Sequence, residues 1–461
     1  MARAYLAAMI AAAAFLAAAT AATAATIAVA AGDGRPLQQV LDAAAPGDVI
    51  RLAAGSHQGP VVIAAPLTLE GEAGAVLAGN GVGSVVTVEA PGAVVRGLEI
   101  SGSGRNIGTF DAGVFVARTA TGAVIEGNRL VGNLYGVNLQ GSADAVVRGN
   151  RIIGLREGRT AEAGNGVHVW NAPGAKVLDN EISQGRDGIF TNASRNNVFS
   201  GNRFSDLRFA VHYMYTNDSE ISDNVSTGNA VGYAIMYSDR LTVRGNVSDG
   251  DRDHGLLLNT AKGSSITGNV VRGALQPVSR WTSAGRRGDT HGVRTDAEPA
   301  AAAAAAAAAG MRLGPEKCVF IYNANRNELA DNWFENCAIG IHFTAGSEGN
   351  RMTGNAFVGN RNQVKYVGTR HLDWSFEGRG NYWSDNPAFD LDGDGVADGP
   401  YRPNDLIDRV LWTAPQAKIL VNSPAVQVIR WAQSQFPAVL PGGVVDTRPL
   451  MTPPQVRTAL P

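Results

Sequence analysis

A repeat of about 22 residues constrains the fold of this chain more than any other feature of its sequence. Asparagine follows a turn residue once per repeat, and most steps between successive asparagines are equal to within one position. A second motif of the Gly-Val-x-Val type stays in phase with these asparagines, so each repeat carries several short strand signals. We therefore expect an all-β chain folded as a right-handed parallel β-helix, a solenoid with about 22 residues per coil. The repeat asparagines are Asn128, Asn150, Asn180, Asn202, Asn224, Asn246, Asn269, Asn332 and Asn355.

Composition agrees with a solenoid of short strands and tight turns. The chain has 56 glycines in 461 residues, 45% hydrophobic residues and 17% charged residues. This apolar content argues against disorder, and the glycine content argues against a coiled coil. The net charge of -2 gives no global field that would attract nucleic acid, so we expect no nucleic-acid partner.

The repeat and its interruptions divide the chain into three parts. We expect a signal peptide at 1–25, the β-helix at 26–380 and a C-terminal cap at 381–461 with an Asp-rich loop and short helices. Inside the β-helix, the step from Asn269 to Asn332 contains a low-complexity insertion at about 275–315 with the alanine run Ala300–Ala309. Ten alanines favour a helix but are marginal alone, so a surface loop is the alternative.

The N-terminus has the pattern of an export signal. Arg3 precedes an apolar run rich in alanine and leucine, and small-residue sites such as Ala22-Thr23-Ala24 follow. The run is too short and too alanine-rich for a convincing membrane span, although a retained anchor is the alternative. We expect an exported protein with no membrane span after cleavage.

Both ends of an open β-helix need covering, because their strand edges would otherwise be exposed. The segment from Pro36 predicts a short amphipathic helix, a turn and then the first strand. Near the other end, Asn404–Trp412 and Ser423–Phe436 predict short helices, with Ser423 as the N-cap and Pro424 at the first helical position.

Cys318 and Cys337 are the only cysteines of the chain. Two cysteines exclude a disulfide scaffold and a four-cysteine zinc site. They could join in an oxidising compartment, but sequence does not decide whether their side chains meet.

One exposed, outward-facing column carries the candidate chemistry. In the in-phase strands, aliphatic residues flank a variable position, which points outward if its neighbours point inward. We expect His212 and Met236 to be neighbours across adjacent coils, with Met214 on the same face and with Tyr213 and Tyr237 pointing the other way. A His-Met-Met group suits a soft ion such as Cu(I), and an aromatic and aliphatic packing stripe is the alternative. The column consists of Phe115, Asn138, His168, Phe190, His212, Met236, Leu257, Phe320, His342 and Lys365.

A second candidate cluster lies in the segment Asp249–Gly255. Asp251, Asp253 and His254 could act as acid and base on a polysaccharide if they converge in a cleft. The alternative is a solvated corner. A polysaccharide-active lyase, epimerase or hydrolase is therefore the competing function.

An aspartate-rich loop near the C-terminus predicts a calcium site. Asp390, Asp392, Asp394 and Asp398 alternate with glycine in the way that wraps oxygen ligands around Ca²⁺, although the distal glutamate of an EF-hand is missing. We expect a structural calcium ion here, with a plain acidic turn as the alternative.

Several stretches together resemble the NosD family of periplasmic β-helix proteins. They include "DLRFAVHYMYTNDSEISDN", "CVFIYNANRNEL" and "NYWSDNPAFDLDGDGVADGPYRPNDLIDRVLW". The resemblance runs from about Thr26 to Pro461 and is specific in order and spacing, whereas the insertion at 275–315 departs from the family pattern.

The resemblance implies a non-enzymatic periplasmic accessory protein. Such proteins work with an ABC transporter, made of a membrane subunit and an ATPase, in maturation of the copper–sulfide centre of nitrous oxide reductase. Nitrous oxide reductase and a membrane-attached copper chaperone are the other implied partners, and copper is the implied ion. The resemblance carries over no ligand residues, so His212, Met214 and Met236 rest on the column alone.

Overall fold

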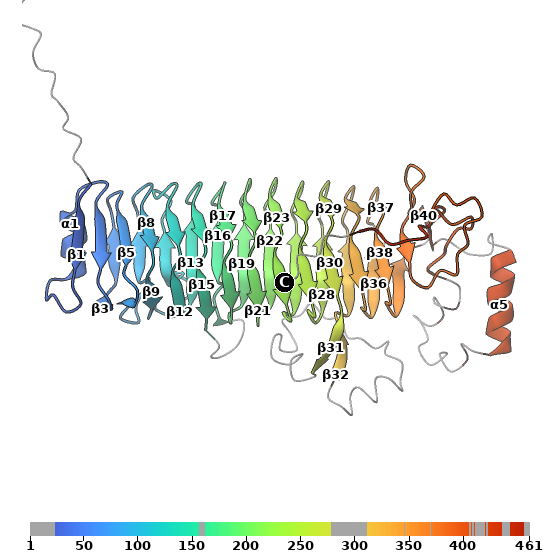
Figure 1. The fold of residues 1–461 in the computed structure, drawn as a ribbon, viewed down its shortest axis with the longest axis horizontal. Coiled ribbons are helices and arrows are strands. Elements are labelled where there is room, and N and C mark those ends of the chain that lie inside the picture. The colour runs from blue at the N-terminus through green and yellow to red at the C-terminus, as the bar shows by residue number, and fades with distance from the viewer. Residues whose placement is uncertain are drawn as a thin grey trace, which may run out of the picture.

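The computed structural model of the chain describes residues 24–155, 162–277, 311–344, 346–368, 370–404, 407, 410, 420, 423–435 and 443–455. It is a straight β-solenoid of about 14 turns, built from three parallel sheets that run along its length (Figure 1). The predicted fold class is therefore confirmed. The predicted signal peptide and the alanine run lie outside the described residues.

Each sheet takes one strand from nearly every coil, and neighbouring strands pair in parallel. We name the sheets A, B and C. Sheet A contains β1 (Thr26–Val29), β2 (Val49–Leu52), β5 (Thr68–Gly71), β8 (Val94–Arg96), β11 (Val124–Glu126), β14 (Val146–Arg148), β17 (Lys176–Leu178), β20 (Val198–Ser200), β23 (Glu220–Ser222), β26 (Thr242–Arg244), β29 (Ser265–Thr267), β34 (Glu328–Ala330) and β37 (Arg351–Thr353).

Sheet B follows sheet A within each coil. It contains β3 (Gly55–Gln58), β6 (Ala75–Ala78), β9 (Glu99–Ser101), β12 (Arg129–Asn133), β15 (Arg151–Gly154), β18 (Glu181–Ser183), β21 (Arg203–Ser205), β24 (Val225–Thr227), β27 (Val247–Asp249), β30 (Val270–Arg272), β35 (Trp333–Glu335), β38 (Ala356–Val358) and β41 (Tyr382–Trp383).

Sheet C completes the coil and carries the candidate site. It contains β4 (Val61–Ile63), β7 (Val86–Val88), β10 (Ala112–Val116), β13 (Tyr135–Gln140), β16 (Val167–Trp170), β19 (Asp187–Asn192), β22 (Phe209–Met214), β25 (Val231–Met236), β28 (His254–Asn259), β33 (Lys317–Tyr322), β36 (Ile339–Thr344) and β39 (Asn362–Val367).

Inward-pointing aliphatic and aromatic side chains of all three sheets form one continuous hydrophobic core. The repeat asparagines line one interior corner as a hydrogen-bonded ladder. The Asn202 amide, for example, donates to the Val177 carbonyl at 2.8 Å and to Asn224 Oδ1 at 2.9 Å. Its own Oδ1 accepts from the Asn180 side chain at 2.9 Å. The ladder explains why asparagine recurs once per coil, since each one satisfies backbone groups that a buried corner would leave unpaired.

The N-terminal cap differs in one respect from the expected order. Helix α1 (Leu37–Ala43) is present, but β1 precedes it and pairs with β2 of sheet A. The first strand therefore lies before the helix, not after it. The sequence Thr26–Val29 is a short β-branched and alanine run, which pattern alone does not separate from the end of an export signal.

The C-terminal part confirms one predicted helix and answers the cysteine question. Helix α5 (Pro424–Gln435) begins at the predicted proline, with the Val426 N–H 3.4 Å from Ser423 Oγ. Most of Asn404–Trp412 lies outside the described residues. Cys318 and Cys337 form a disulfide with their Cα atoms 5.6 Å apart.

Two further strand pairs lie outside the three main sheets. An antiparallel pair, β31 (Ala274–Pro277) and β32 (Met311–Gly314), forms the base of the insertion. Strand β42 (Gly443–Val445) returns to pair with β40 (His371–Asp373). Among the described residues, no helix has the length and apolar character needed to cross a bilayer.

Candidate metal site on the outer face of sheet C

The outer face of sheet C is the face that points away from the solenoid core. On β22, Val211 and Tyr213 are fully buried in the core, so His212 between them points outward, as predicted. The column is not exposed as expected, however: His212 and Met236 are each 7% exposed. Because these side chains face outward and are still buried, this face offers dry surroundings for an ion, unlike an ordinary solvated solenoid face.

The predicted pairing of His212 with Met236 is wrong by two positions. The register places His212 beside Ala234, and Met214 beside Met236. A slip of two positions keeps every side chain on the same face, so alternation of apolar residues does not reveal it. The same three candidate ligands therefore remain on this face, in a different arrangement. Met214 and Met236 lie side by side on adjacent strands, and His212 precedes Met214 by two positions on the same face.

A buried carboxylate fixes the orientation of the His212 ring. Asp187 Oδ2 lies 3.1 Å from His212 Nδ1, and Arg208 donates to both oxygens of the same carboxylate at 2.8 and 2.7 Å. Burial alone would raise the pKa of the Asp187 carboxyl, but the Arg208 charge and the His212 hydrogen bond lower this pKa well below its usual range. An ionised carboxylate only accepts hydrogen bonds, so Nδ1 of His212 donates to Asp187 and Nε2 is the ring nitrogen left for another partner.

The free nitrogen of His212 has no partner within the described part of the protein. Nε2 is buried and makes no hydrogen bond. The ring packs edge-on against Phe190 and Phe209, at centroid distances of 5.0 and 4.7 Å. A ring nitrogen without a partner, on an imidazole that a carboxylate orients from the other side, is the arrangement of a metal-ligating histidine with its supporting carboxylate.

The two methionines lie in a small apolar cluster on this face, separate from the main core. Met236 packs there with Phe209, Val231, Ala234 and Leu257, and the half-buried Met214 packs against it. The side chain beside His212 in the next coil is only a methyl group, that of Ala234. The residues present therefore fit a soft ion: one imidazole and two thioethers in a dry environment, with a carboxylate behind the imidazole.

His168 belongs to the same column, two coils before His212, as predicted. Phe190 lies between the two rings, 5.1 Å from His168 and 5.0 Å from His212. Burial lowers the pKa of His168 to about 4. The phenyl ring between them keeps the two imidazoles from sharing one ion.

Tyr237 does not point inward with Tyr213. It is 42% exposed, with a φ of 50°, because it lies just beyond the end of β25, where strand alternation stops. Tyr215 occupies the same place after β22, and the two rings stack at 5.0 Å.

The carboxylates of the competing polysaccharide site do not converge. Asp251 is fully buried and accepts hydrogen bonds from Ser226 and Ser248 at 2.7 and 2.6 Å. His254, in contrast, lies on the outer face of sheet C, 5.5 Å from Phe320. Asp251 thus serves the interior corner of the coil and does not join His254 in the predicted acid–base group.

The aspartate loop brings three of its four candidate ligands together. Ligand atoms of Asp390, Asp392 and Asp394 lie within 4.8 Å of one another. Asp398 instead accepts the Leu391 N–H at 2.8 Å and is not part of this group. Calcium at the remaining three carboxylates stays a prediction.

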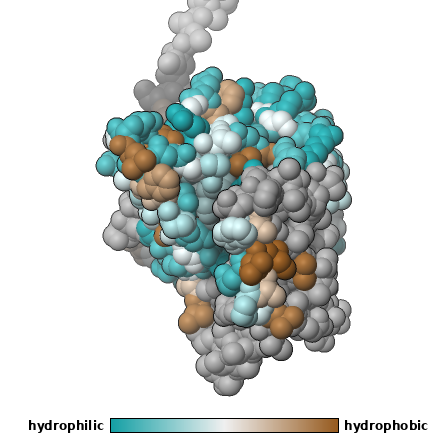
Figure 2. Space-filling model, turned by 90° about the vertical axis from the view of Figure 1, so that its right-hand side faces the viewer, coloured by the Kyte–Doolittle hydropathy of each residue, from teal (hydrophilic) through white to brown (hydrophobic). Residues whose placement is uncertain are grey.

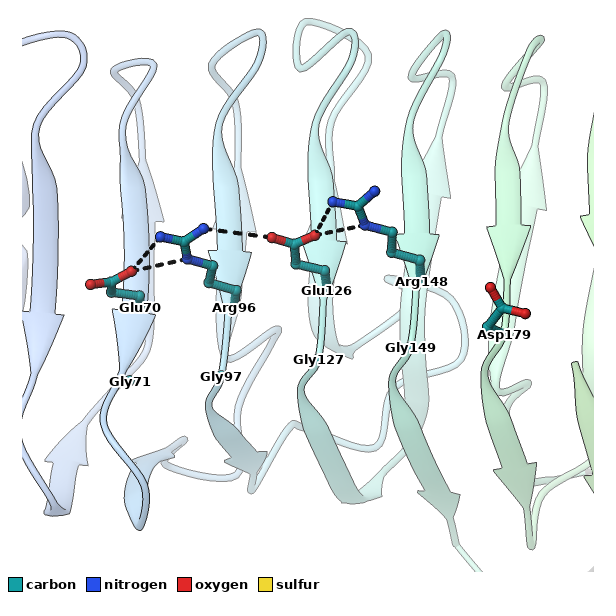
Figure 3. A pocket seen from close by; sticks show the side chains of 9 residues that line it. All are labelled: Glu70, Gly71, Arg96, Gly97, Glu126, Gly127, Arg148, Gly149 and Asp179. Carbon is teal, nitrogen blue, oxygen red and sulfur yellow. Dashed lines mark hydrogen bonds and ion pairs between the residues drawn. The ribbon is translucent and has the colours of Figure 1, made fainter. Parts of the chain in front are cut away.

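A shallow groove of about 510 Å³ lies far from these residues, along sheet A (Figure 3). Its wall is a ladder of alternating charges in which Glu70, Arg96, Glu126 and Arg148 each pair with the next. The Arg96 charge is satisfied at 2.6 Å by Glu70, whose pKa is lowered chiefly by that hydrogen bond. Because these four charges neutralise one another, the ladder is a stabilising feature and leaves no charge directed at a ligand.

Sequence reasoning missed Asp187, the residue that orients His212. A signal existed: Asp187 lies one repeat length before Phe209, so the repeat places it one coil before the residue that begins the His212 strand. Arg208, which holds the carboxylate, precedes Phe209 directly.

Comparisons with known proteins point to one family. Residues 154–388 match the family model described as "Periplasmic copper-binding protein (NosD)". A protein of Stutzerimonas stutzeri named "Probable ABC transporter binding protein NosD" is 42% identical over 404 residues, which cover 88% of this chain and 87% of that protein. A protein of the same name from Pseudomonas aeruginosa is also 42% identical over 404 residues. Among solved structures, a family 28 exopolygalacturonase of Yersinia enterocolitica is 12% identical, with a TM-score of 0.49 over 75% of this chain and 77% of that one.

Proposed function

Because the chain belongs to the NosD family, we propose that it is a periplasmic accessory protein that handles copper for the copper–sulfide centre of nitrous oxide reductase. Copper is the cargo here, not a resident cofactor. We further propose that Cu(I) binds at His212, Met214 and Met236. The membrane subunit and the ATPase of an ABC transporter, a membrane-attached copper chaperone and nitrous oxide reductase are the proposed partners.

One observation carries the copper site: His212 presents a buried nitrogen without a partner, and a carboxylate holds its other nitrogen. A buried polar atom without a hydrogen bond costs about 1–3 kcal/mol, so an ion that fills this position would recover a real free-energy cost. The in-register thioethers of Met214 and Met236 favour the soft Cu(I) over hard cations such as Mg²⁺ or Ca²⁺.

An exposed aromatic edge beside the methionines supports a protein partner at this place. Trp170, Tyr215, Tyr237 and Tyr322 are 37–54% exposed and lie at the C-terminal ends of sheet C strands or directly after them. The strands β16 to β33 span five steps of about 4.8 Å, so the row is roughly 24 Å long, comparable with one side of an ordinary interface. Tyrosine and tryptophan dominate the binding energy of protein interfaces.

Tyr215 and Tyr237 are held in an uncommon backbone conformation. Their φ values are 48° and 50°, which is unfavourable for a bulky side chain. The equivalent corners of neighbouring coils share this conformation but hold smaller residues: Asn171, Ala193, Thr260 and Asn323. Each tyrosine directly follows one of the two methionines. This continuity supports a role for the edge in docking the protein that delivers or accepts the ion.

The C-terminal end of the solenoid offers a second contact region, at α5 beyond the last coils (Figure 1). Val428 and Trp431 of this helix are 62% and 64% exposed, and Figure 2, which faces this end, shows brown hydrophobic groups on the surface. Exposed apolar groups of this kind mark interaction sites. We propose that this end meets the membrane subunit of the transporter.

Anaerobic Cu(I) titration of the exported chain against a competing chelator tests the site. We expect one strongly bound Cu(I), and a fall in affinity of tenfold or more in His212→Ala and in the double variant Met214→Leu/Met236→Leu. Asp187→Asn should reduce affinity by about 10–100-fold, because the imidazole loses its orienting carboxylate. Matched controls are Met352→Leu, a core methionine, and His371→Ala, an exposed histidine.

A double variant of Tyr215 and Tyr237 distinguishes docking of a protein partner from binding of Cu(I). Tyr215→Asn/Tyr237→Asn keeps the residue type found at equivalent corners, so it should leave Cu(I) affinity unchanged while slowing copper loading of nitrous oxide reductase in cells. If Cu(I) affinity is unchanged in His212→Ala and in Met214→Leu/Met236→Leu, the copper site does not lie on this face. A normal copper content of nitrous oxide reductase in the tyrosine variant would show that the aromatic edge does not dock the copper partner.

A further inference from the structure

The outer face of sheet C carries a second buried polar group, several strands beyond the methionines. It is built by His254 on β28, Lys317 on β33, His342 on β36 and Lys365 on β39. The register pairs His254 with Lys317, and His342 with both Phe320 and Lys365. Four consecutive strands therefore bring two imidazoles and two ammonium groups to one area.

His254 is buried and His342 is half-buried, and three of their ring nitrogens are buried atoms that lack partners within the described part of the chain. Nδ1 of His254 and both ring nitrogens of His342 make no hydrogen bond. Phe320 separates the two rings, at 5.5 Å from His254 and 5.0 Å from His342. Three imidazole nitrogens without partners in one area indicate that a polar ligand completes the site.

Lys317 is one of the most deeply buried side chains of the molecule, at 1% exposure. Its Nζ lies 3.0 Å from a Glu316 carboxylate oxygen and 5.0 Å from the centre of the Phe320 ring. Glu316 is the ion-pair partner of Lys317, and among the described residues Nζ has no further hydrogen-bond acceptor, so its other N–H groups can reach a ligand.

The electrostatic surroundings are opposite to those of His212. Burial lowers the pKa of His342 to about 3, and the charges of Lys317 and Lys365 contribute in the same direction. Burial also lowers the pKa of His254 well below its usual range, again with a contribution from Lys317. Both rings are therefore neutral at physiological pH and can donate an N–H. Burial lowers the pKa of Lys317, and the Glu316 carboxylate opposes that shift by favouring the charged ammonium group, which with Lys365 repels a metal cation.

We propose that Lys317, His342, His254 and Lys365 form a binding site for a small monovalent anion. Two ammonium groups supply the attraction, Glu316 offsets one of them, and the imidazole N–H groups complete the shell of donors. The proposal does not depend on copper binding, since it uses none of His212, Met214 or Met236.

Burial and the phenyl ring narrow the class of anion. A strongly hydrated anion loses more free energy on entering a dry site than a weakly hydrated one. Phe320 at the centre of the group offers a polarisable, apolar contact. Weakly hydrated, polarisable anions such as iodide and hydrosulfide should therefore bind more tightly than chloride. Hydrosulfide is of particular interest if the proposed function holds, because a protein that assembles a copper–sulfide centre needs both elements.

Calorimetric titration of the full exported chain with sodium iodide, sodium hydrosulfide and sodium chloride, under anaerobic conditions, tests the proposal. We expect one site for iodide or hydrosulfide, with chloride at least tenfold weaker. Lys317→Met and His342→Phe should each weaken binding tenfold or more, whereas Lys317→Arg should retain it. A crystal soaked in iodide should show an anomalous peak within contact distance of Lys317 Nζ.

The controls separate this site from the copper site. His212→Ala should lose Cu(I) and keep the anion, and His342→Phe should lose the anion and keep Cu(I). Iodide does not reduce disulfides, so its binding is independent of the Cys318–Cys337 pair. Absence of binding by both iodide and hydrosulfide would overturn the proposal, as would binding that is unchanged in Lys317→Met and His342→Phe, or an iodide peak located elsewhere.

Discussion

Two arrays of buried polar side chains run along this solenoid, and they are satisfied to different degrees. The asparagine ladder fills an interior corner, and each amide donates to and accepts from its neighbours, as Asn202 does with Asn180 and Asn224. The outer face of sheet C is partly to fully buried as well. Yet, among the residues that the structure describes, several of its outward-facing side chains have buried polar atoms without a hydrogen bond: Asn138, Gln140, His212, His254, Lys317 and His342.

This difference distinguishes structural polarity from functional polarity. Buried amides that satisfy one another hold the coils in register and need nothing from outside the chain. Buried imidazole nitrogens without hydrogen-bond partners reduce stability until something binds them. A ligand or ion that binds on the outer face of sheet C would therefore recover more free energy than one that binds at the asparagine ladder.

The largest change in the free energy of unfolding is expected when the asparagine ladder is interrupted. Asn202→Ala removes the contacts of the Nδ2 group with the Val177 and Ser200 carbonyls and with Asn224 Oδ1. It also leaves the backbone and side-chain N–H groups of Asn180 without the oxygen to which they donate. We expect a loss of about 3 kcal/mol in the free energy of unfolding, measured by urea denaturation. Arg203→Ala, an exposed change at the next residue, is the control and should change stability by less than about 0.5 kcal/mol.

A smaller effect on stability, of opposite sign, is expected at Asp251. This interior position holds a carboxylate, although a neutral amide could accept a hydrogen bond there as well. Burial raises the pKa of its carboxyl to about 6, despite hydrogen bonds from Ser248, Ser226 and the Asn229 N–H. The folded protein thus binds this proton more tightly than the unfolded chain, and stability falls as pH rises from about 4 through 6. Asp251→Asn should raise the free energy of unfolding by about 2–3 kcal/mol at pH 8 and leave it unchanged at pH 4.

Thermal unfolding of the unaltered protein and of Asp251→Asn between pH 4 and pH 8 measures this pH-dependent difference in stability. A constant difference across that range would show that the Asp251 carboxyl does not titrate in the folded protein.

The smallest effect is expected on the outer face itself. His342→Leu replaces two nitrogens that lack partners with an apolar side chain of similar size, so stability should stay within about 1 kcal/mol and shift upward. Urea denaturation in chloride-free buffer gives the value. A loss of about 2 kcal/mol or more, the cost of breaking existing hydrogen bonds, would mean that the His342 nitrogens already have partners and that the contrast between the two arrays is false.

The repeat made most of the fold predictable, because a constant period with three strand signals has few solutions. It also identified the outward column, including His168 and His212. What the pattern did not resolve was register: Val211-His212-Tyr213 and Ile235-Met236-Tyr237 look alike, and a slip of two positions preserves the face. Counting one repeat length forward from His212 gives Ala234, so the asparagine spacing held the information that local similarity obscured.

Other features depend on contacts that no local pattern encodes. The Asp187 carboxylate reaches His212 from the preceding coil, and the burial of the outer face is a property of the whole fold. Asp251 lies between Asp249 and Asp253 in the sequence, so it looked like part of a solvated or catalytic cluster. Its hydrogen-bond partners are Ser248, three positions before it, and Ser226 of the preceding coil, and neither serine marks Asp251 as an interior residue in the sequence.

X-ray absorption at the copper edge of the Cu(I)-loaded protein tests the central claim most directly. The account predicts mixed coordination by nitrogen and sulfur, with the sulfur contribution lost in Met214→Leu/Met236→Leu and the nitrogen contribution reduced in His212→Ala. Sulfur coordination that persists in the double methionine variant, or coordination by nitrogen and oxygen alone in the unaltered protein, would contradict it.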